Sequence, residues 1–259
     1  FILGTYAAQF KSPNRVTQDL GLSASLFPNN PGVTVTGGDY TLVVGGLAIM
    51  GQNGAPFTGD VTVKFVYRKA VPAAGSLDLH LYFTGAGGIT AESAPTDMLI
   101  QGAVTRLREI YAQANVELGA ISYHSADARF QTITDITGTG GDLEELFTQS
   151  AGQGRGLHFF FVDRFMGGFP GATVAGIAGG LPGAPDSVGT VGAGVAVAVT
   201  TAMGDSGVLG HVMAHEGGHW LGLFHTSEVT QTTDQHPETP AGQAGNTYLM
   251  YPAVGGGTT

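Results

Sequence analysis

The residues best suited to chemistry lie in one stretch near the end of the chain, HEGGHWLGLFH, which spans residues 215–225. His215 and His219 stand four positions apart, Glu216 directly follows the first of them, and His225 comes six residues after the second. On a helix, positions i and i+4 project from the same face, so the imidazoles of His215 and His219 can reach one point. Two neutral imidazoles that converge in this way are suited to Zn²⁺.

The other residues of the stretch complete a metal site of the catalytic kind. Glu216 is placed to activate a zinc-bound water as general base and then to pass the proton to a leaving amine. His225 cannot share the helix face, and Gly222 supplies the left-handed conformation with which a helix can end and the chain turn back. Three protein ligands leave a fourth position open for water or substrate, as a catalytic zinc site requires.

The whole pattern, H-E-x-x-H-x-x-G-x-x-H, resembles the signature of the metzincin clan of zinc endopeptidases, which continues to a downstream Met-turn. Met250, in the segment NTYLMYP (246–252), stands 25 residues past His225 and would be the methionine beneath the metal. Within the clan, HWLGLFHT (219–226) is most similar to the pappalysin family, and DQHPETP (234–240) echoes that family's Asp-Thr-Pro loop. The resemblance follows the order of elements over residues 77–254 and is specific over 211–252.

This resemblance implies a zinc-dependent endopeptidase that acts on protein or peptide substrates. Several metzincins carry a tyrosine two residues after the methionine, where it binds zinc or steadies the oxyanion. Here Tyr251 follows directly and Pro252 takes that place, so Tyr251 and Tyr248 are equal candidates. The strand expected near 193–200 would be the edge strand above the cleft, where a peptide can bind by strand addition.

Two glycines inside the motif are unusual, because each lowers helix stability by about 0.8–1 kcal/mol relative to alanine. Gly218, before the second histidine, suits close packing beneath the Met-turn. The sequence offers no reason for Gly217.

Other patterns compete with the zinc peptidase reading. A non-catalytic surface binding or adhesion protein on a metalloprotease scaffold is the alternative function. The GDSG stretch at 204–207 matches a serine-protease signature, but Asp205 or Ser206 is better explained as the cap of the zinc helix. Asp234 and Glu238 could bind Ca²⁺, although two carboxylates in a loop are usually only solvated.

Composition narrows the class of protein. The 259 residues are 42% hydrophobic and 12% charged, which permits a sizeable core, and the net charge of -10 argues against nucleic acid as a partner. The absence of cysteine excludes disulfides and thiolate metal sites.

Low charge and 43 glycines are typical of an exported bacterial protein, so we expect a secreted or cell-envelope location. The uncharged stretch 187–204 reads as a buried strand and not as a membrane span; the oligomeric state stays open.

The elements that must position these residues indicate an α/β (α+β) fold in two parts. Residues 1–75 predict an N-terminal β-domain, a small antiparallel sandwich followed by a linker at 71–76. Its expected strands are 33–36, 40–44 and 61–67. Residues 76–259 predict a metzincin-like peptidase domain with a twisted mixed sheet and two main helices.

Within the second part we expect four strands and three helices. The strands are 77–83, 116–122, 157–162 and 193–200, the last preceded by a Gly-rich loop over 167–192. The helices are 96–114, 142–149 capped by Asp142, and the helix that begins near Asp205 and carries the motif. The first helix shows an apolar stripe of Leu99, Ala103, Leu107, Ile110 and Ala114. Four histidines outside the motif are expected to be structural (His80, His124, His158, His236), and His211 to neighbour the site or lie at the surface.

Overall fold

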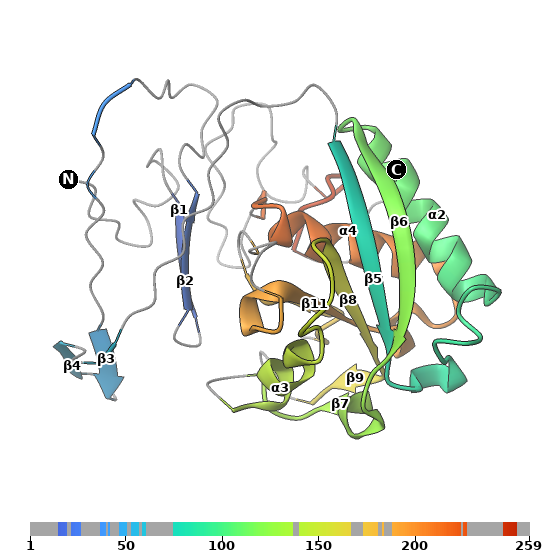
Figure 1. Cartoon of the computed structure of the whole chain (residues 1–259), viewed down its shortest axis with the longest axis horizontal. Coiled ribbons are helices and arrows are strands. Elements are labelled where there is room, and N and C mark those ends of the chain that lie inside the picture. Colours follow the sequence, from blue (N-terminus) through green and yellow to red (C-terminus); the bar gives the residue numbers. More distant parts are fainter. Residues whose placement is uncertain are drawn as a thin grey trace.

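The centre of the protein is a five-stranded mixed sheet, seen in a computed structural model of the chain (Figure 1). The order is β10-β11-β8-β5-β6, and neighbours are parallel except β10, which is antiparallel to β11. The strands are β5 (Gly75–Phe83), β6 (Val116–Ser125), β8 (Leu157–Val162), β10 (Gly176–Ala178) and β11 (Gly194–Ala198). The structure describes residues 75–136, 140–166, 173–180, 183, 188–223, 225–226 and 246–252, with short pieces between 15 and 60.

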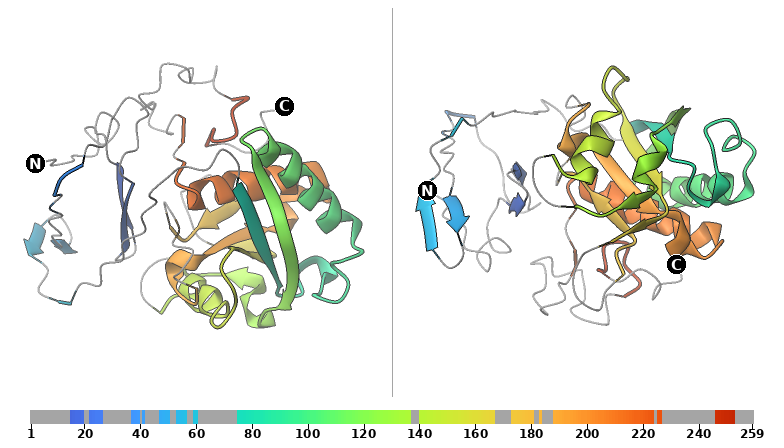
Figure 2. Two further views of the ribbon diagram at one scale, coloured as in Figure 1. Left: turned by 45° about the horizontal axis from the view of Figure 1, so that its top comes forward. Right: turned by 90° about the horizontal axis from the view of Figure 1, so that it is seen from below.

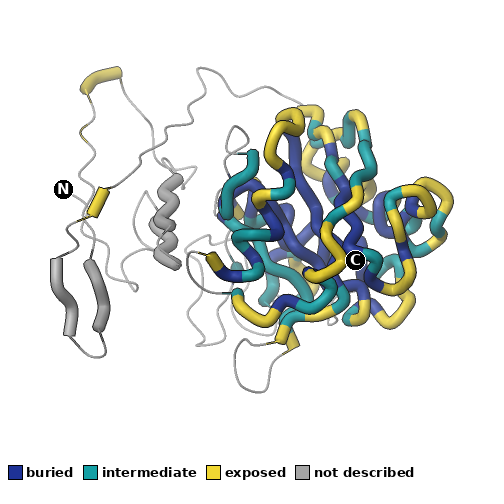
Figure 3. The backbone as a smooth tube through the Cα atoms, turned by 60° about the horizontal axis from the view of Figure 1, so that its bottom comes forward, coloured by how far each residue is buried: buried dark blue, intermediate teal, exposed yellow. Residues whose placement is uncertain are grey.

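Helices cover both faces of this sheet (Figures 1 and 2). The helices α2 (Met98–Ala112) and α4 (Ser206–Trp220) pack against the face that carries Leu79, Leu81 and Phe83. The shorter α3 (Asp142–Thr148) packs with Tyr82 and Phe160 on the other face. Every residue of β8 and β11 is therefore buried, which accounts for their largely apolar sequences (Figure 3). The predicted α/β fold with a twisted mixed sheet is confirmed, and the uncharged stretch 187–204 does contain a buried strand.

The helix α2 begins one residue after its cap, Asp97, whose side chain accepts a hydrogen bond of 3.0 Å from the backbone N–H of Ile100. Its buried stripe is Ile100, Ala103, Val104, Leu107 and Tyr111. The predicted stripe was therefore rotated: Leu99 and Ile110 are only partly buried, and Ala114 lies beyond the helix end. The reason is that α2 must face both the sheet and α4, a direction set by tertiary packing.

The edge of the sheet is not where the sequence placed it. The strand near 193–200 is β11, which lies inside the sheet between β10 and β8. Among the described strands, the edge on that side of the sheet is β10, inside the segment expected to be only a Gly-rich loop, and β6 forms the opposite edge. Three residues, Gly-Ile-Ala, are too few to show an alternating pattern, so no strand was predictable there.

The cap of α3 also differs from expectation. Gly141 is the N-cap, and Asp142 is the first residue of the helix. The Asp142 carboxylate instead accepts hydrogen bonds from the backbone N–H and hydroxyl of Thr134 and from the backbone N–H of Asp135. These bonds tie the helix to β7 (Thr132–Ile133), which pairs with β9 (Arg164–Phe165). Short 3-10 turns complete this part of the chain: Ala86–Gly88, Ala128–Gln131, Val191–Ala193 and Val199–Ala202.

In the N-terminal part the structure describes two antiparallel pairs. Strands β1 (Arg15–Asp19) and β2 (Leu22–Leu26) form one, and β3 (Leu47–Met50) and β4 (Asn53–Pro56) form the other. The expected strands 33–36, 40–44 and 61–67 lie outside the described residues apart from Thr41, so the sandwich and the domain boundary stay predictions. Gly75 and Ser76 of the expected linker belong to β5. Over the described part of the chain, no helix combines the length and apolar character needed to cross a membrane.

Candidate metal centre

The helix that carries the motif begins with a side-chain cap. The Asp205 carboxylate accepts hydrogen bonds from the backbone N–H groups of Gly207 (2.7 Å) and Val208 (3.1 Å). The interpretation of GDSG as a helix cap is confirmed, with Asp205 as the capping residue. Ser206 packs between the two long helices, since a Cβ added to Gly102 would lie 2.5 Å from its Oγ.

The helix ends in the turn that the glycine predicts. Leu221 is the C-cap, and Gly222 follows with a φ of 103°, in the left-handed region. The N–H of Leu223 bonds to the carbonyl of Gly218 (2.9 Å), and the N–H of Gly222 bonds to the carbonyl of His219 (2.8 Å). This is the Schellman arrangement, which satisfies the last carbonyls and reverses the chain. It brings His225 back over the helix.

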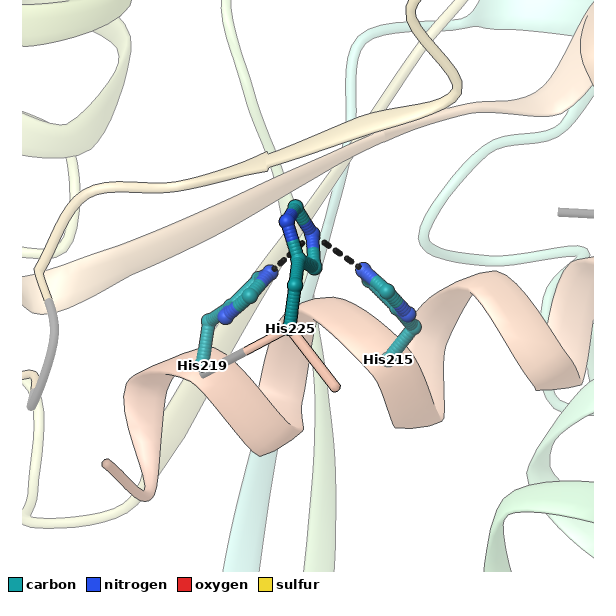
Figure 4. A group of neighbouring side chains, drawn as sticks. All are labelled: His215, His219 and His225. Atoms are coloured by element: carbon teal, nitrogen blue, oxygen red, sulfur yellow. Dashed lines mark hydrogen bonds between the residues drawn. The ribbon is translucent and has the colours of Figure 1, made fainter. Parts of the chain in front are cut away.

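The three histidines of the motif converge on one point (Figure 4). The Nε2 atom of His225 lies 3.3 Å from that of His215 and 3.1 Å from that of His219. The opposite ring nitrogens of His215 and His219 contact backbone carbonyls: Nδ1 of His215 lies 2.7 Å from the oxygen of Leu249, and Nδ1 of His219 lies 2.8 Å from the oxygen of Leu223. Because a carbonyl only accepts, both Nδ1 atoms carry the proton, and both Nε2 atoms present a lone pair.

These positions fit a zinc ion. Tetrahedral zinc with bonds of about 2.0–2.1 Å holds its nitrogen ligands about 3.3 Å apart. The two Nε2 separations that involve His225 are close to that value. The carbonyls behind the rings fix the tautomer and ring orientation that a metal ligand needs. His215, His219 and His225 are therefore the residues that can hold the metal.

Burial keeps the first two imidazoles neutral. It lowers the pKa of His215 to about 4, with His225 adding to this and the Leu249 carbonyl opposing it. Burial also lowers the pKa of His219 well below its usual value. Neutral imidazole is the form that binds a metal, so these two ligands lose no binding free energy to deprotonation near pH 7.

Glu216 lies under the edge strand. Its side chain is only 7% exposed, and burial raises its pKa to about 8, partly offset by a hydrogen bond from the backbone of Ala178. A Cβ added to Gly176 would overlap the Cγ of Glu216 and lie 3.0 Å from its Oε1. The carboxylate is thus held between α4 and β10, next in sequence to a metal ligand.

The Met-turn candidate lies beneath the helix that carries the ligands. Met250 is 6% exposed, and its sulfur lies against Gly218. Its carbonyl accepts a hydrogen bond of 3.0 Å from the N–H of Thr226, the residue after His225. The segment around Met250 therefore contacts both the helix and the returning chain, and through Leu249 it also contacts His215.

The two candidate tyrosines stand on either side of this turn. The N–H of Tyr251 bonds to the carbonyl of Tyr248 at 3.1 Å. Tyr248 is 39% exposed and, with His211, lines a cavity of about 310 Å³ between α2, α4 and the turn. A catalytic role for either tyrosine stays a prediction. Asp234, Glu238 and His236 lie outside the described residues, so the Ca²⁺ site does too.

Three other histidines, His80, His124 and His158, form a separate group on the opposite face of the sheet. His80 pairs in register with Ser122 of β6 and His158 of β8, and its ring stacks on that of His158 at 4.5 Å. The Ser122 hydroxyl lies 2.8 Å from both His80 Nδ1 and His124 Nε2. The Tyr82 hydroxyl lies 3.1 Å from His158 Nδ1. These histidines bond to neighbouring strands and lie away from the metal-binding triad.

Three convergent imidazoles thus lie beside a buried carboxylate. The chain belongs to metallopeptidase family M12, because the family model Reprolysin_5, described as "Metallo-peptidase family M12", matches residues 89–259. The narrower assignment to the pappalysin-type family stays a prediction.

Two solved structures are among those that the chain resembles. One is metalloproteinase-II from Bacteroides fragilis, with a TM-score of 0.42, 14% identity, and coverage of 74% of this chain and 51% of that one. The other is archaemetzincin from Methanopyrus kandleri, with a TM-score of 0.38, 15% identity, and coverage of 60% and 79%. The chain spans about half the length of the Bacteroides protein. No curated protein matches the chain, so the family assignment rests on the family model.

Proposed function

We propose that the protein is a zinc-dependent endopeptidase that hydrolyses peptide bonds in protein substrates. The observation that carries the proposal is the convergence of three Nε2 atoms, from His215, His219 and His225, beside the buried carboxylate of Glu216. Zinc held there would act as a Lewis acid on the carbonyl of the bond to be cut and would lower the pKa of the attacking water.

Glu216 then moves the proton. Its carboxylate takes a proton from the attacking water and delivers it to the nitrogen of the leaving amine. Burial favours the protonated form of this carboxyl, whereas the hydrogen bond from the Ala178 backbone favours the charged form, as a cation held by the histidines would. These opposing influences suit a group that must both accept and release a proton in one turnover.

The edge strand β10 supplies the place for an extended substrate. A peptide that adds to β10 as a further strand is held through its backbone, which tolerates varied side chains. The same strand bonds to Glu216 through Ala178. The strand that would align the substrate therefore also holds the general base. Tyr248 and Tyr251 remain the candidates for stabilising the oxyanion.

The test compares the full chain with Glu216→Gln, a substitution that keeps the size of the side chain and removes its base. We expect one zinc per chain in both proteins and a loss of kcat of about 10²–10⁴-fold in the variant. Cut sites are mapped by proteomics, with 1,10-phenanthroline as chelator and the non-chelating 1,7 isomer as its control. Full activity in Glu216→Gln would rule out the mechanism. A protein that binds one zinc and cuts nothing in a broad peptide library would favour the non-catalytic binding protein.

A further inference from the structure

Gly217, in the centre of the metal-binding helix, is closed in on the side where a side chain would project. A Cβ at this position would overlap the hydroxyl oxygen of Tyr111 and lie 3.0 Å from Cδ2 of Leu157 and 3.3 Å from Cζ of Phe159. Tyr111 comes from the last turn of α2, and Leu157 and Phe159 come from β8. Glycine is therefore required here for close approach, which accounts for the helix propensity that the residue gives up.

The hydroxyl that fills this space is also a hydrogen-bond donor to the helix. Oη of Tyr111 lies 3.3 Å from the carbonyl oxygen of Ala214. The Tyr111 side chain is buried, with 4% of its surface exposed, so the hydroxyl would lack a water partner if this contact were lost. One atom of α2 therefore contacts α4 at both Ala214 and Gly217.

The contacts at Ala214 and Gly217 lie on either side of the metal ligand and the candidate base in the sequence. Ala214 directly precedes the metal ligand His215, and Gly217 directly follows the candidate base Glu216. On the far side, Glu216 is confined by Gly176 of the edge strand. If α4 slid along its axis or rotated about it, the hydrogen bond at Ala214 would break or Gly217 would press against the Tyr111 hydroxyl.

We infer that Tyr111 is a positioning residue, whose hydroxyl, seated in the space that Gly217 leaves, fixes the helix so that His215 and Glu216 keep their places. The inference rests on the proposed function for its kinetic consequence. Displacements of about 1 Å in a catalytic group can lower the rate by about 10²-fold, so loss of one such contact has a measurable effect on kcat.

The experiment is a double-mutant cycle with Tyr111→Phe, Gly217→Ala and the double variant. We measure kcat and KM on a cleaved peptide, thermal unfolding of the metal-free protein, and the visible spectrum of the Co²⁺-substituted protein. Tyr111→Phe should lower kcat about tenfold, leave KM within about twofold and alter the cobalt spectrum. Gly217→Ala should unfold at a lower temperature or fail to fold.

The double variant separates positioning from bulk stability. Removal of the hydroxyl relieves the closest overlap of the alanine methyl, so the unfolding temperature should rise from that of Gly217→Ala towards that of Tyr111→Phe, while kcat stays at the level of Tyr111→Phe. If Gly217→Ala does not fold alone, recovery of folded protein in the double variant is the expected result. Effects that simply add, or an unchanged kcat and cobalt spectrum in Tyr111→Phe, would overturn the inference.

Two matched controls probe other contacts of the same helices. Tyr123→Phe removes a hydroxyl that lies 3.1 Å from Gln101 of α2, and it should leave kcat unchanged. Gly210→Ala crowds the carbonyl of Ala103, where a Cβ would lie 2.6 Å away, and Tyr111→Phe should not rescue it. If the wild type cuts no substrate, the proposed function fails, and the cobalt spectrum and the unfolding cycle still decide the inference. If it does cut, an unchanged kcat and cobalt spectrum in Tyr111→Phe reject the positioning role and leave the proposed function standing.

Discussion

The sulfur of Met250 stands where a side chain at Gly218 would project, since a Cβ added to Gly218 would lie 2.7 Å from Sδ. Gly218 directly precedes His219, so the packing of a methionine far along the chain sets how closely the metal-binding helix and the turn approach. We predict that Gly218→Ala lowers the free energy of unfolding by about 1–3 kcal/mol and weakens zinc binding, because the methionine must move. Urea denaturation and chelator competition measure the two effects. Met250→Ala should relieve the crowding in a double variant, and a Gly218→Ala protein that binds zinc normally would contradict this.

Zinc should stabilise the fold by linkage. A ligand present at about 1,000 times its Kd adds about 4 kcal/mol to the free energy of unfolding. Removal of zinc from the wild type should therefore lower the melting temperature, and His225→Ala should lose most of this response. His211→Ala is the control, because His211 lies four residues before His215 but outside the triad. An equal loss of the zinc response in both variants would argue against His225 as the third ligand.

Gly176 should be intolerant of a side chain. Its Cβ would overlap Glu216, so Gly176→Ala must displace either the base or the edge strand. We expect kcat to fall about 10–100-fold with the zinc content unchanged, measured by peptide cleavage and metal analysis. Gly75→Ala, at a strand position where an added Cβ meets nothing within 4 Å, should be neutral. Equal activity of the two variants would show that Glu216 does not need its place under β10.

Asp205 should contribute stability but no chemistry. Asp205→Ala should lower the free energy of unfolding by about 1 kcal/mol, because two backbone N–H groups lose their acceptor. Urea denaturation measures this loss.

Ser206→Ala should retain peptide cleavage, and serine-directed acylating reagents should not inhibit the wild type. Loss of cleavage in Ser206→Ala, in protein that is folded and zinc-loaded, would reopen the serine hydrolase interpretation.

His158 should make the fold sensitive to acid. Burial lowers its pKa to about 4, helped by the charge of His80 and, less, by His124, and opposed by the Gly154 backbone. Histidine in the unfolded chain titrates near pH 6.5, so the unfolded state takes up the proton first. The contribution of neutral His158 to the free energy of unfolding is complete above about pH 6.5. It is lost as the pH falls towards 4, and the loss is at most on the order of 3 kcal/mol.

The variant His158→Asn isolates this effect, since an amide can still bond to the Tyr82 hydroxyl but does not titrate. Urea unfolding of the metal-free proteins at pH 7.5, 5.5 and 4.5 should show a shallower loss of stability in the variant. Metal-site histidines contribute equally to both proteins. Parallel stability curves would mean that His158 is protonated as easily in the folded protein as in the unfolded one.

Local signals predicted the parts of this protein that local chemistry determines. The histidine spacing, the Asp205 cap and the Gly222 turn each depend on neighbours within one or two helical turns, and the convergence of the three imidazoles follows from them. The buried strand 157–162 was readable because its composition alone indicates coverage on both faces.

What the sequence could not show depends on contacts across the fold. The reason for Gly217 lies in Tyr111, on another helix, and no spacing rule connects them. The stack of His80 on His158 depends on the register of β5 with β8, which only the assembled sheet defines. The edge strand β10 is too short to have a pattern of its own, and it is a strand because β11 offers it hydrogen bonds.

The fit between Tyr111 and Gly217 also restricts the order in which the two positions can change during evolution. A descendant that acquires alanine at 217 first must pass through a protein whose metal-binding helix collides with the tyrosine. A descendant that first exchanges Tyr111 for phenylalanine keeps the ring and opens room for the methyl group. Replacement of Tyr111 on α2 must therefore come before a side chain is acquired at position 217 of α4. Sequences of relatives should carry a side chain at 217 only where the residue at 111 has no hydroxyl.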